Sequence, residues 1–206
     1  MTFNIGIYLF NEFTALDAVG PWDVFSYAAK DVNNIEVMMI TKDGKSVHTD
    51  TGLTVMAHKS IDEVKNLDLL IIPGGLGTRQ EINDTKVINW IKEVTKDSRY
   101  ITSVCTGVLL LEVAGFAVGK RVTTYHAFVE TLESRGKVSE VISKVSFVKD
   151  GNLVTSAGVS GGIDMSLWLV GQLWGKNQAR KTRSRLQYEP SPPYTSELDN
   201  DTTGSD

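Results

Sequence analysis

The sequence contains few of the residues that are typical of disulfide-bonded, zinc-binding and nucleic-acid-binding proteins. Its 206 residues include one cysteine, three histidines and five prolines, and the formal net charge is -4. A single cysteine excludes an intramolecular disulfide and supplies too few thiolates for a structural zinc site of the usual kind. The acidic balance, without a long basic run, argues against nucleic acid as a partner, because phosphate binding requires concentrated lysine and arginine.

Targeting and membrane segments are also missing from the pattern. The first residues, Met1 to Ile7, have no basic region and include polar residues too early for a secretory signal. No apolar run approaches the length that spans a membrane. We therefore expect a cytoplasmic protein in a reducing compartment, with no membrane partner.

The apolar content is high enough for one well-packed domain. Hydrophobic residues make up 41% of the chain, which predicts a single α/β domain over residues 1–187. The composition then changes. We expect an extended proline-rich segment at 188–194 and a disordered acidic tail at 195–206.

The stretch 100–111 predicts a buried strand that runs into a helix, with Cys105 at the junction. Tyr100 to Val104 is a β-branched and aromatic run, and the helical pattern follows it directly. Ser103 and Gly107 are small, so the backbone can make the sharp turn that presents the nucleophile of α/β-hydrolases. A thiol at a helix N-terminus should have a lowered pKa, which favours a nucleophilic or redox-active cysteine.

A second stretch, Leu67 to Arg79, predicts a central strand that ends at Pro73 and continues into a glycine-rich loop. Glycines permit a tight turn whose N–H groups face whatever lies beyond the strand end. The loop lacks the spacing of a P-loop or a dinucleotide fingerprint, so an oxyanion hole facing Cys105 is favoured over nucleotide binding. A glycine-rich turn without chemistry is the alternative.

Asp17 and His126 are further candidates for chemistry. With Pro21 in the first turn of a helix, Asp17 falls at the start of that helix, either as a cap or as an acid placed by the first strand-to-helix connection. His126 follows a short strand and is the one histidine placed like the base of a cysteine hydrolase. His48 and His58 have no second ligand at metal-like spacing, so no metal site is expected.

The remaining elements have conventional patterns. The predicted strands lie at 3–10, 35–41 and 120–124, the helices at 87–94 and 163–173, and short strands within 47–57. Residues 145–148 and 153–156, joined by a turn built on Asp-Gly, predict a hairpin.

Three motifs of the sequence together resemble a known family. The loop at 73–79, the elbow at 102–107 and the small-residue stretch at 156–164 look like those of the ThiJ/PfpI superfamily, over nearly the whole chain. The resemblance implies a flavodoxin-like three-layer sandwich with a mostly parallel central sheet, and a homodimer. The early Asp17, the Cys105-Thr106 pair and the segment at 188–194 are similar to those of its isocyanide hydratases.

The resemblance also implies roles for individual residues. Cys105 matches the nucleophile and Asp17 the acidic residue that contacts it. Thr106 matches the residue after the nucleophile, and Gly75 the loop glycine whose backbone helps to form the anion site.

Two pocket residues are weaker candidates. His126 stands one position later than the histidine of the hydratases, which tend to have Thr-Thr-His-Trp where this chain has Thr-Thr-Tyr-His. Trp22 is a second candidate, for the apolar part of the pocket, although a place in the core also explains it.

The resemblance implies hydration of an isocyanide, R–N≡C, to an N-substituted formamide, without a metal or organic cofactor. The expected partner is therefore a small electrophile. Two alternatives remain open: a glyoxalase-like enzyme acting on reactive carbonyls, and a redox sensor or stress protein in which Cys105 is oxidised.

Overall fold

The computed structural model describes residues 2–189, so the predicted tail at 195–206 and most of the proline-rich segment before it lie outside the described residues. The strands are β1 (Phe3–Tyr8), β2 (Ile35–Thr41), β3 (Val47–His48), β4 (Thr54–Val55), β5 (Lys59–Ser60), β6 (Leu69–Ile72), β7 (Tyr100–Val104), β8 (Arg121–Val122), β9 (Glu140–Val141), β10 (Phe147–Asp150) and β11 (Leu153–Ser156). The α-helices are α1 (Ala15–Ala29), α2 (Thr78–Glu81), α3 (Thr85–Val94), α4 (Val108–Val113), α5 (Val129–Ser134), α6 (Gly161–Trp174) and α7 (Lys176–Arg185), and short 3-10 helices are η1 (Ile61–Glu63), η2 (Cys105–Gly107) and η3 (His126–Phe128).

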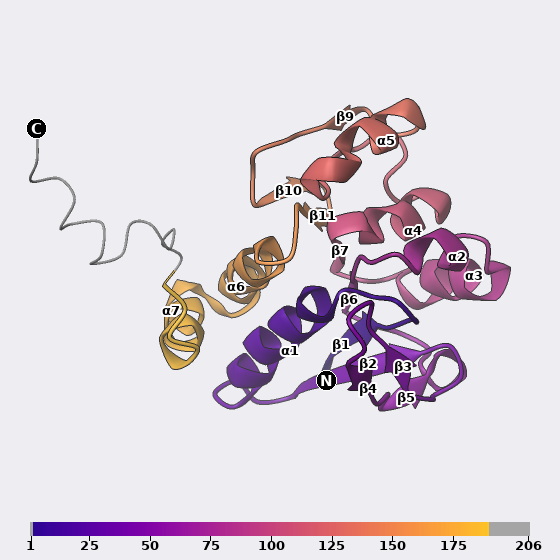
Figure 1. Ribbon diagram of the computed structural model, residues 1–206. Coiled ribbons are helices and arrows are strands. Elements are labelled where there is room, and N and C mark those ends of the chain that lie inside the picture. Colours follow the sequence, from indigo (N-terminus) through magenta and orange to yellow (C-terminus); the bar gives the residue numbers. More distant parts are fainter. Residues whose placement is uncertain (1, 190–206) are drawn as a thin grey trace, which may run out of the picture.

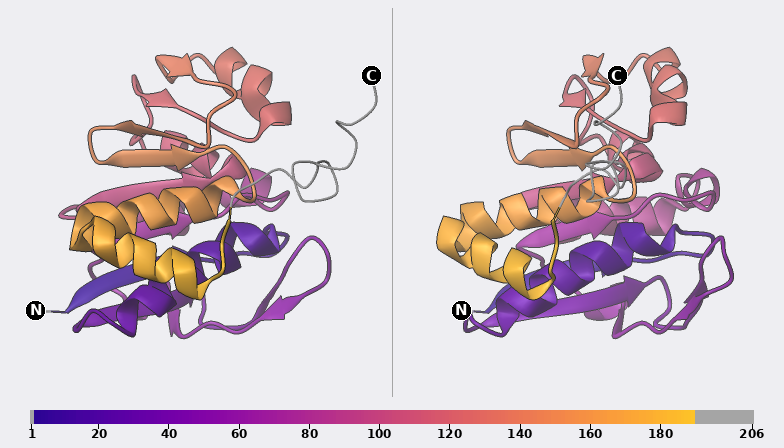
Figure 2. Two further views of the ribbon diagram at one scale, coloured as in Figure 1. Left: turned by 90° about the vertical axis from the view of Figure 1, so that its left-hand side faces the viewer. Right: turned by 60° about the vertical axis from the view of Figure 1, so that its left-hand side comes forward.

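A seven-stranded sheet forms the middle layer, in the order β10-β11-β7-β6-β1-β2-β5. Neighbouring strands are parallel throughout, except that β10 runs antiparallel to β11. Helices α1, α6 and α7 pack together on one face, and α3 and α4 cover the other (Figures 1 and 2). This arrangement confirms the flavodoxin-like three-layer sandwich.

The central strands are apolar on both faces because helices cover both sides of the sheet. All four residues of β6 are buried, as are the last four of β7. Parallel strands bring their carboxyl ends to one edge of the sheet, where open α/β sheets bind ligands. The segments that follow β1, β6 and β7 therefore begin there, and they carry Asp17 in the first turn of α1, the glycine loop and Cys105.

The predicted hairpin is present, and its second strand has the predicted bounds, but its first strand is β10 (Phe147–Asp150) and not 145–148, because pairing continues up to the two turn residues. Strands β10 and β11 pair from Phe147 with Ser156 to Asp150 with Leu153, which leaves Gly151 and Asn152 as the turn. Gly151 has a φ of 66°, the positive value that tight hairpin turns require. The short strands expected within 47–57 are β3 and β4, which pair with each other.

The prediction that Pro21 lies in the first turn of its helix was wrong. Helix α1 begins at Ala15, so Pro21 lies inside it, and Asp17 is in its first turn. A proline cannot donate to the carbonyl four residues earlier, which here belongs to Asp17. The prediction followed from the preference of proline for the first turn of a helix. The helix instead begins at Ala15, well before the proline.

Beyond the main sheet, the chain between α4 and β10 forms a small cap. Strands β8 and β9 pair in parallel, and α5 lies beside them at the top of Figure 1. The buried Glu112 of α4 forms an ion pair with Arg135, which follows α5. Through this pair the cap is tied to the helix that follows the cysteine.

Within residues 2–189, no helix combines the length and the apolar character needed to cross a bilayer.

Candidate active site

The structure brings Asp17, Gly75, Cys105 and Thr106 together at the carboxyl edge of the sheet. The Gly74 N–H donates to Asp17 Oδ2 at 2.9 Å, and the Gly75 N–H donates to Thr106 Oγ1 at 3.0 Å. A pocket of about 280 Å³ opens beside the thiol. Its lining residues are Thr14, Asp50, Gly75, Leu76, Arg79, Cys105, Thr106, Tyr125 and Val159.

Cys105 occupies a strained elbow between β7 and η2. Its φ is 55°, a left-handed value that is uncommon for a residue with a side chain, and only 7% of its surface is exposed. Such backbone strain concentrates at functional sites, where surrounding structure holds it in place. The predicted nucleophile elbow is therefore present in backbone conformation as well as in element order.

Gly107 makes this elbow possible because the turn passes close to β6. A Cβ at this position would lie 2.2 Å from the Ile72 carbonyl oxygen and 2.7 Å from that of Pro73. Both neighbours are backbone, so neither can move without disturbing the strand end.

We expect Gly107→Ala to lower the free energy of unfolding by about 2–4 kcal/mol, as overpacked and strained sites do. Urea denaturation measures this loss. Ser134→Ala, at an exposed helix position, is the matched control. Equal stability of the Gly107 and Ser134 variants would contradict the close approach.

Asp17 is a buried acid with an incomplete set of hydrogen bonds. Its side chain is fully buried, and within residues 2–189 its Oδ1 has no hydrogen-bond partner of good geometry. Burial raises the pKa of Asp17 to about 7, and the charge of Asp50 acts in the same direction. The Gly74 N–H and the Cys105 thiol, as donors, oppose part of this rise. Asp17 can therefore hold or release a proton near neutral pH.

The expectation of a lowered pKa for the thiol was wrong. Burial, followed by the negative charge of Asp17, raises the pKa of Cys105 to about 12. The Thr106 backbone N–H and the charge of Arg79 act in the opposite direction but do not compensate. The resting group is consequently a thiol, and a base must remove its proton before it can act as a nucleophile.

The glycine loop differs from a simple oxyanion hole. Because the Gly75 N–H donates to Thr106 Oγ1, it does not point freely into the pocket. The backbone N–H of Thr106 instead interacts with the Cys105 sulfur. The loop conformation itself requires glycine, since Gly75 has a φ of 129° and a Cβ there would lie 2.2 Å from the Glu12 carbonyl oxygen.

Arg79 is a site residue that sequence reasoning missed. Its Nη1 donates to the Gly75 carbonyl oxygen and to Thr78 Oγ1, both at 2.9 Å, and its guanidinium lies over the Phe128 ring at 5.0 Å. It therefore supplies a fixed positive charge in the lining of the Cys105 pocket. The predicted loop ended at this residue, but nothing in the sequence signalled that the side chain folds back over the glycines.

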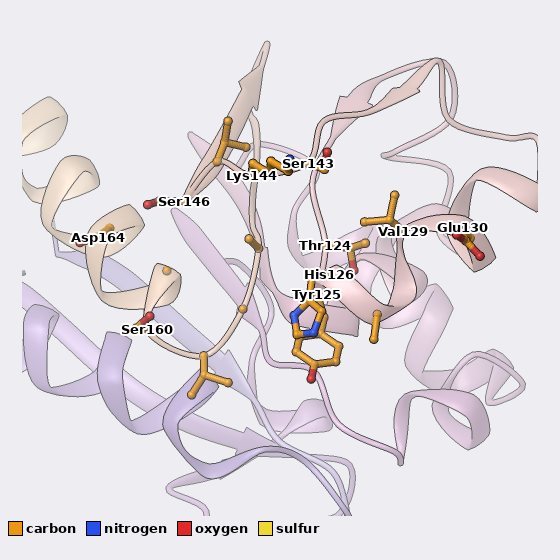
Figure 3. A pocket seen from close by; sticks show the side chains of 16 residues that line it. Thr124, Tyr125, His126, Val129, Glu130, Ser143, Lys144, Ser146, Ser160 and Asp164 are labelled. Atoms are coloured by element: carbon orange, nitrogen blue, oxygen red, sulfur yellow. The ribbon is translucent and has the colours of Figure 1, made fainter. Parts of the chain in front are cut away.

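The two weaker candidates lie outside the Cys105 pocket. His126 is exposed and lines a neighbouring cavity, where its ring lies 4.2 Å from that of Tyr125 (Figure 3). Trp22 is half-buried on α1 and stacks on His58, with 5.1 Å between ring centroids. Tyr125 and Val159 line the pocket in their place, and neither was predicted from the sequence to have a role in the site.

A cysteine in a strained strand-to-helix turn lies beside a buried aspartate, where the parallel strands of the central sheet end. These features define a three-layer α/β protein with a cysteine at the elbow that follows a central strand. Residues 4–172 match the profile of the DJ-1/PfpI family, and the chain belongs to this family.

Individual proteins of known sequence or structure are similar to this chain. The chain is 35% identical to the isonitrile hydratase of Pseudomonas putida, over 95% of this chain and 83% of that protein. Among solved structures, a ThiJ/PfpI family protein from Pseudomonas syringae superposes with a TM-score of 0.85 at 26% identity, over 96% of this chain and 79% of the other. Drosophila melanogaster DJ-1beta has a TM-score of 0.81 at 22% identity, covering 92% and 100%, and this likeness concerns the fold alone.

Proposed function

We propose that this protein is an isonitrile hydratase, which converts an isocyanide and water into an N-substituted formamide. The observation that carries the proposal is the buried Asp17 carboxyl, with a pKa near neutrality, beside a thiol at a strained elbow. The identity to the Pseudomonas putida hydratase supports it. The proposed assembly is a homodimer, on the family resemblance.

In the first step, the Cys105 sulfur adds to the terminal carbon of the isocyanide. Ionised Asp17 accepts the thiol proton and delivers it to the same carbon, so that sulfur and hydrogen both add there. The product is a thioimidate, R–N=CH–S–Cys105, and Asp17 is again a carboxylate. The raised pKa of the thiol makes this transfer necessary, because a free thiolate is scarce.

In the second step, water adds to the imidate carbon. Asp17 takes a proton from the water and passes it to the nitrogen, which gives a tetrahedral adduct. Collapse of this adduct forms the formamide carbonyl and expels the Cys105 sulfur, which recovers the hydroxyl proton through Asp17. The Thr106 N–H and the Arg79 charge, which favour the thiolate, stabilise the departing sulfur.

The redox-sensor alternative is less well supported by this site. Sensor cysteines have a low pKa and are accessible to solvent. Cys105 has a raised pKa and is 7% exposed. A glyoxalase-like activity would use the same thiol and carboxyl, so an activity assay is needed to distinguish it from isocyanide hydration.

The test is production of formamide from cyclohexyl isocyanide by the purified, reduced protein. We expect turnover that is proportional to protein concentration and unaffected by chelators. Methylglyoxal is the parallel substrate for the glyoxalase alternative. Consumption of methylglyoxal, without formamide from the isocyanide, would reject the hydratase.

The pH dependence of kcat/KM follows from the pKa of Asp17. Only ionised Asp17 can accept the thiol proton, so below a pH of about 7 the rate should fall about tenfold per pH unit. Above that pH it should level off, because the pKa of Cys105 lies far higher. Initial rates between about pH 5.5 and 9, corrected for uncatalysed hydrolysis, measure this profile. A rate that rises toward acid would mean that protonated Asp17 is the active form.

A further inference from the structure

The Cys105 pocket adjoins a second and larger cavity. This cavity has a volume of about 940 Å³ and lies between the cap and the loop that precedes α6 (Figure 3). Tyr125 and Val159 line both spaces, so the two meet at these side chains. Neither the thiol nor Asp17 lines the larger cavity.

The geometry of an isocyanide requires space in line with the reacting carbon. The R–N≡C group is linear, so R extends along one axis beyond the reacting carbon, at an angle to the direction from which the Cys105 sulfur attacks. The Cys105 pocket has about 280 Å³, slightly below the size of typical ligand sites, whereas the adjoining cavity lies within their range. A long R group can therefore enter the cavity by passing Tyr125 and Val159, which line both spaces.

The cavity walls suit a chain with an apolar stem and a polar end. Val129, Val145 and Ala157 provide apolar surface. Glu130 and Lys144 provide charged groups, and within the described residues neither of them forms an ion pair. Both are exposed at the cavity, where they can hydrogen-bond a polar substituent.

The Tyr125 ring is held at the junction. On one side it contacts the His126 ring, with 4.2 Å between centroids. On another side it lies against Gly158, where an added Cβ would be 3.4 Å from the tyrosine Cδ2. The side chain is 37% exposed, so it borders the passage without being buried in the core.

From these observations we infer that the larger cavity binds the R group of an elongated isocyanide with a hydrogen-bonding end, and that Tyr125 and Val159 border the passage to it. The inference rests on the proposed hydratase activity and names its substrate class.

The test compares two substrates and fills the cavity at a point remote from the thiol. The probes are methyl isocyanide and n-hexyl isocyanide with a terminal hydroxyl group. Ser146 lines only the larger cavity and its side chain is exposed, so Ser146→Trp adds bulk there, with Ser146→Ala as the matched control (Figure 3).

For the wild type we expect kcat/KM for the hydroxyhexyl probe to exceed that for methyl isocyanide by at least about tenfold, as burial of several methylenes would give. Ser146→Trp should remove most of this preference and leave the methyl isocyanide rate within about twofold. Ser146→Ala should change neither rate.

Other outcomes separate this inference from the proposed function. If methyl isocyanide is hydrated but the tryptophan variant leaves the substrate preference unchanged, the inference is wrong and the hydratase stands. A tryptophan variant with an altered oligomeric mass and equal losses on both substrates would assign the cavity to a contact between copies of the chain. Failure of both substrates with the wild type would reject the hydratase and this inference together.

Discussion

Asp17→Asn should lose nearly all hydratase activity while making the folded protein more stable at alkaline pH. The amide oxygen can still accept the Gly74 N–H, so the local geometry is preserved. An amide cannot accept the thiol proton or deliver it to carbon, and we expect kcat to fall by about 10²–10⁴-fold. The formamide assay measures this loss.

The gain in stability follows from the direction of the Asp17 pKa shift. The pKa is 3.8 for the ordinary group and about 7 in the folded protein, so between these values the folded state binds more protons than the unfolded state. The free energy of unfolding of the wild type therefore decreases as pH rises through this window, and the loss is complete above about pH 7. An asparagine does not ionise, so the Asp17→Asn variant does not lose this stability as the pH rises.

The free energy of unfolding of Asp17→Asn, measured relative to that of the wild type, should increase by on the order of 2–4 kcal/mol when the pH is raised from 4 to 8. Urea unfolding of both proteins at these two pH values gives the difference. Asp23→Asn, on the exposed side of the same helix, is the matched control and should show no such gain. A stability difference that does not change with pH would mean that Asp17 has an ordinary pKa in the folded protein.

Cys105→Ala should abolish turnover, with a fall in kcat/KM of at least about a thousandfold. The proposed reaction has no second nucleophile, because ionised Asp17 serves as the base. Cys105→Ser keeps the size of the side chain and the hydrogen-bonding capacity, yet its hydroxyl is a far weaker acid than a thiol, so it should be similarly impaired.

Both cysteine variants should remain folded, which circular dichroism checks, since neither substitution enlarges the side chain at the elbow. Substantial formamide production by Cys105→Ala would show that water attacks the isocyanide directly. The role of Cys105 as the nucleophile would then be lost, although Asp17 could retain its own.

The sequence was sufficient for the parts of the fold that depend on local patterns. The bounds of β7, Tyr100 to Val104, agree with the structure, because a run of β-branched and aromatic residues ends at small ones where the chain turns. The hairpin followed from its turn residues. The glycine loop and the cysteine elbow also lie where the patterns placed them.

The pKa of the cysteine could not be obtained in this way. The pKa of Cys105 depends on burial by the whole fold and on a carboxylate from the connection after β1, whereas the local signal was a helix N-terminus. That helix, α4, is short and preceded by a 3-10 turn, so its dipole is outweighed. Arg79 and Tyr125 reach the pocket through side-chain placement that no spacing rule encodes.

The most direct test of the account is the mass of the protein during turnover. Acid-quenched samples taken in the first turnovers on cyclohexyl isocyanide should contain a species heavier than the free chain by one intact isocyanide, located to the peptide that holds Cys105. This is the mass of the thioimidate, and the species should be absent from Cys105→Ala. Steady formamide production with no such adduct, at quench times shorter than one turnover, would contradict covalent catalysis by Cys105.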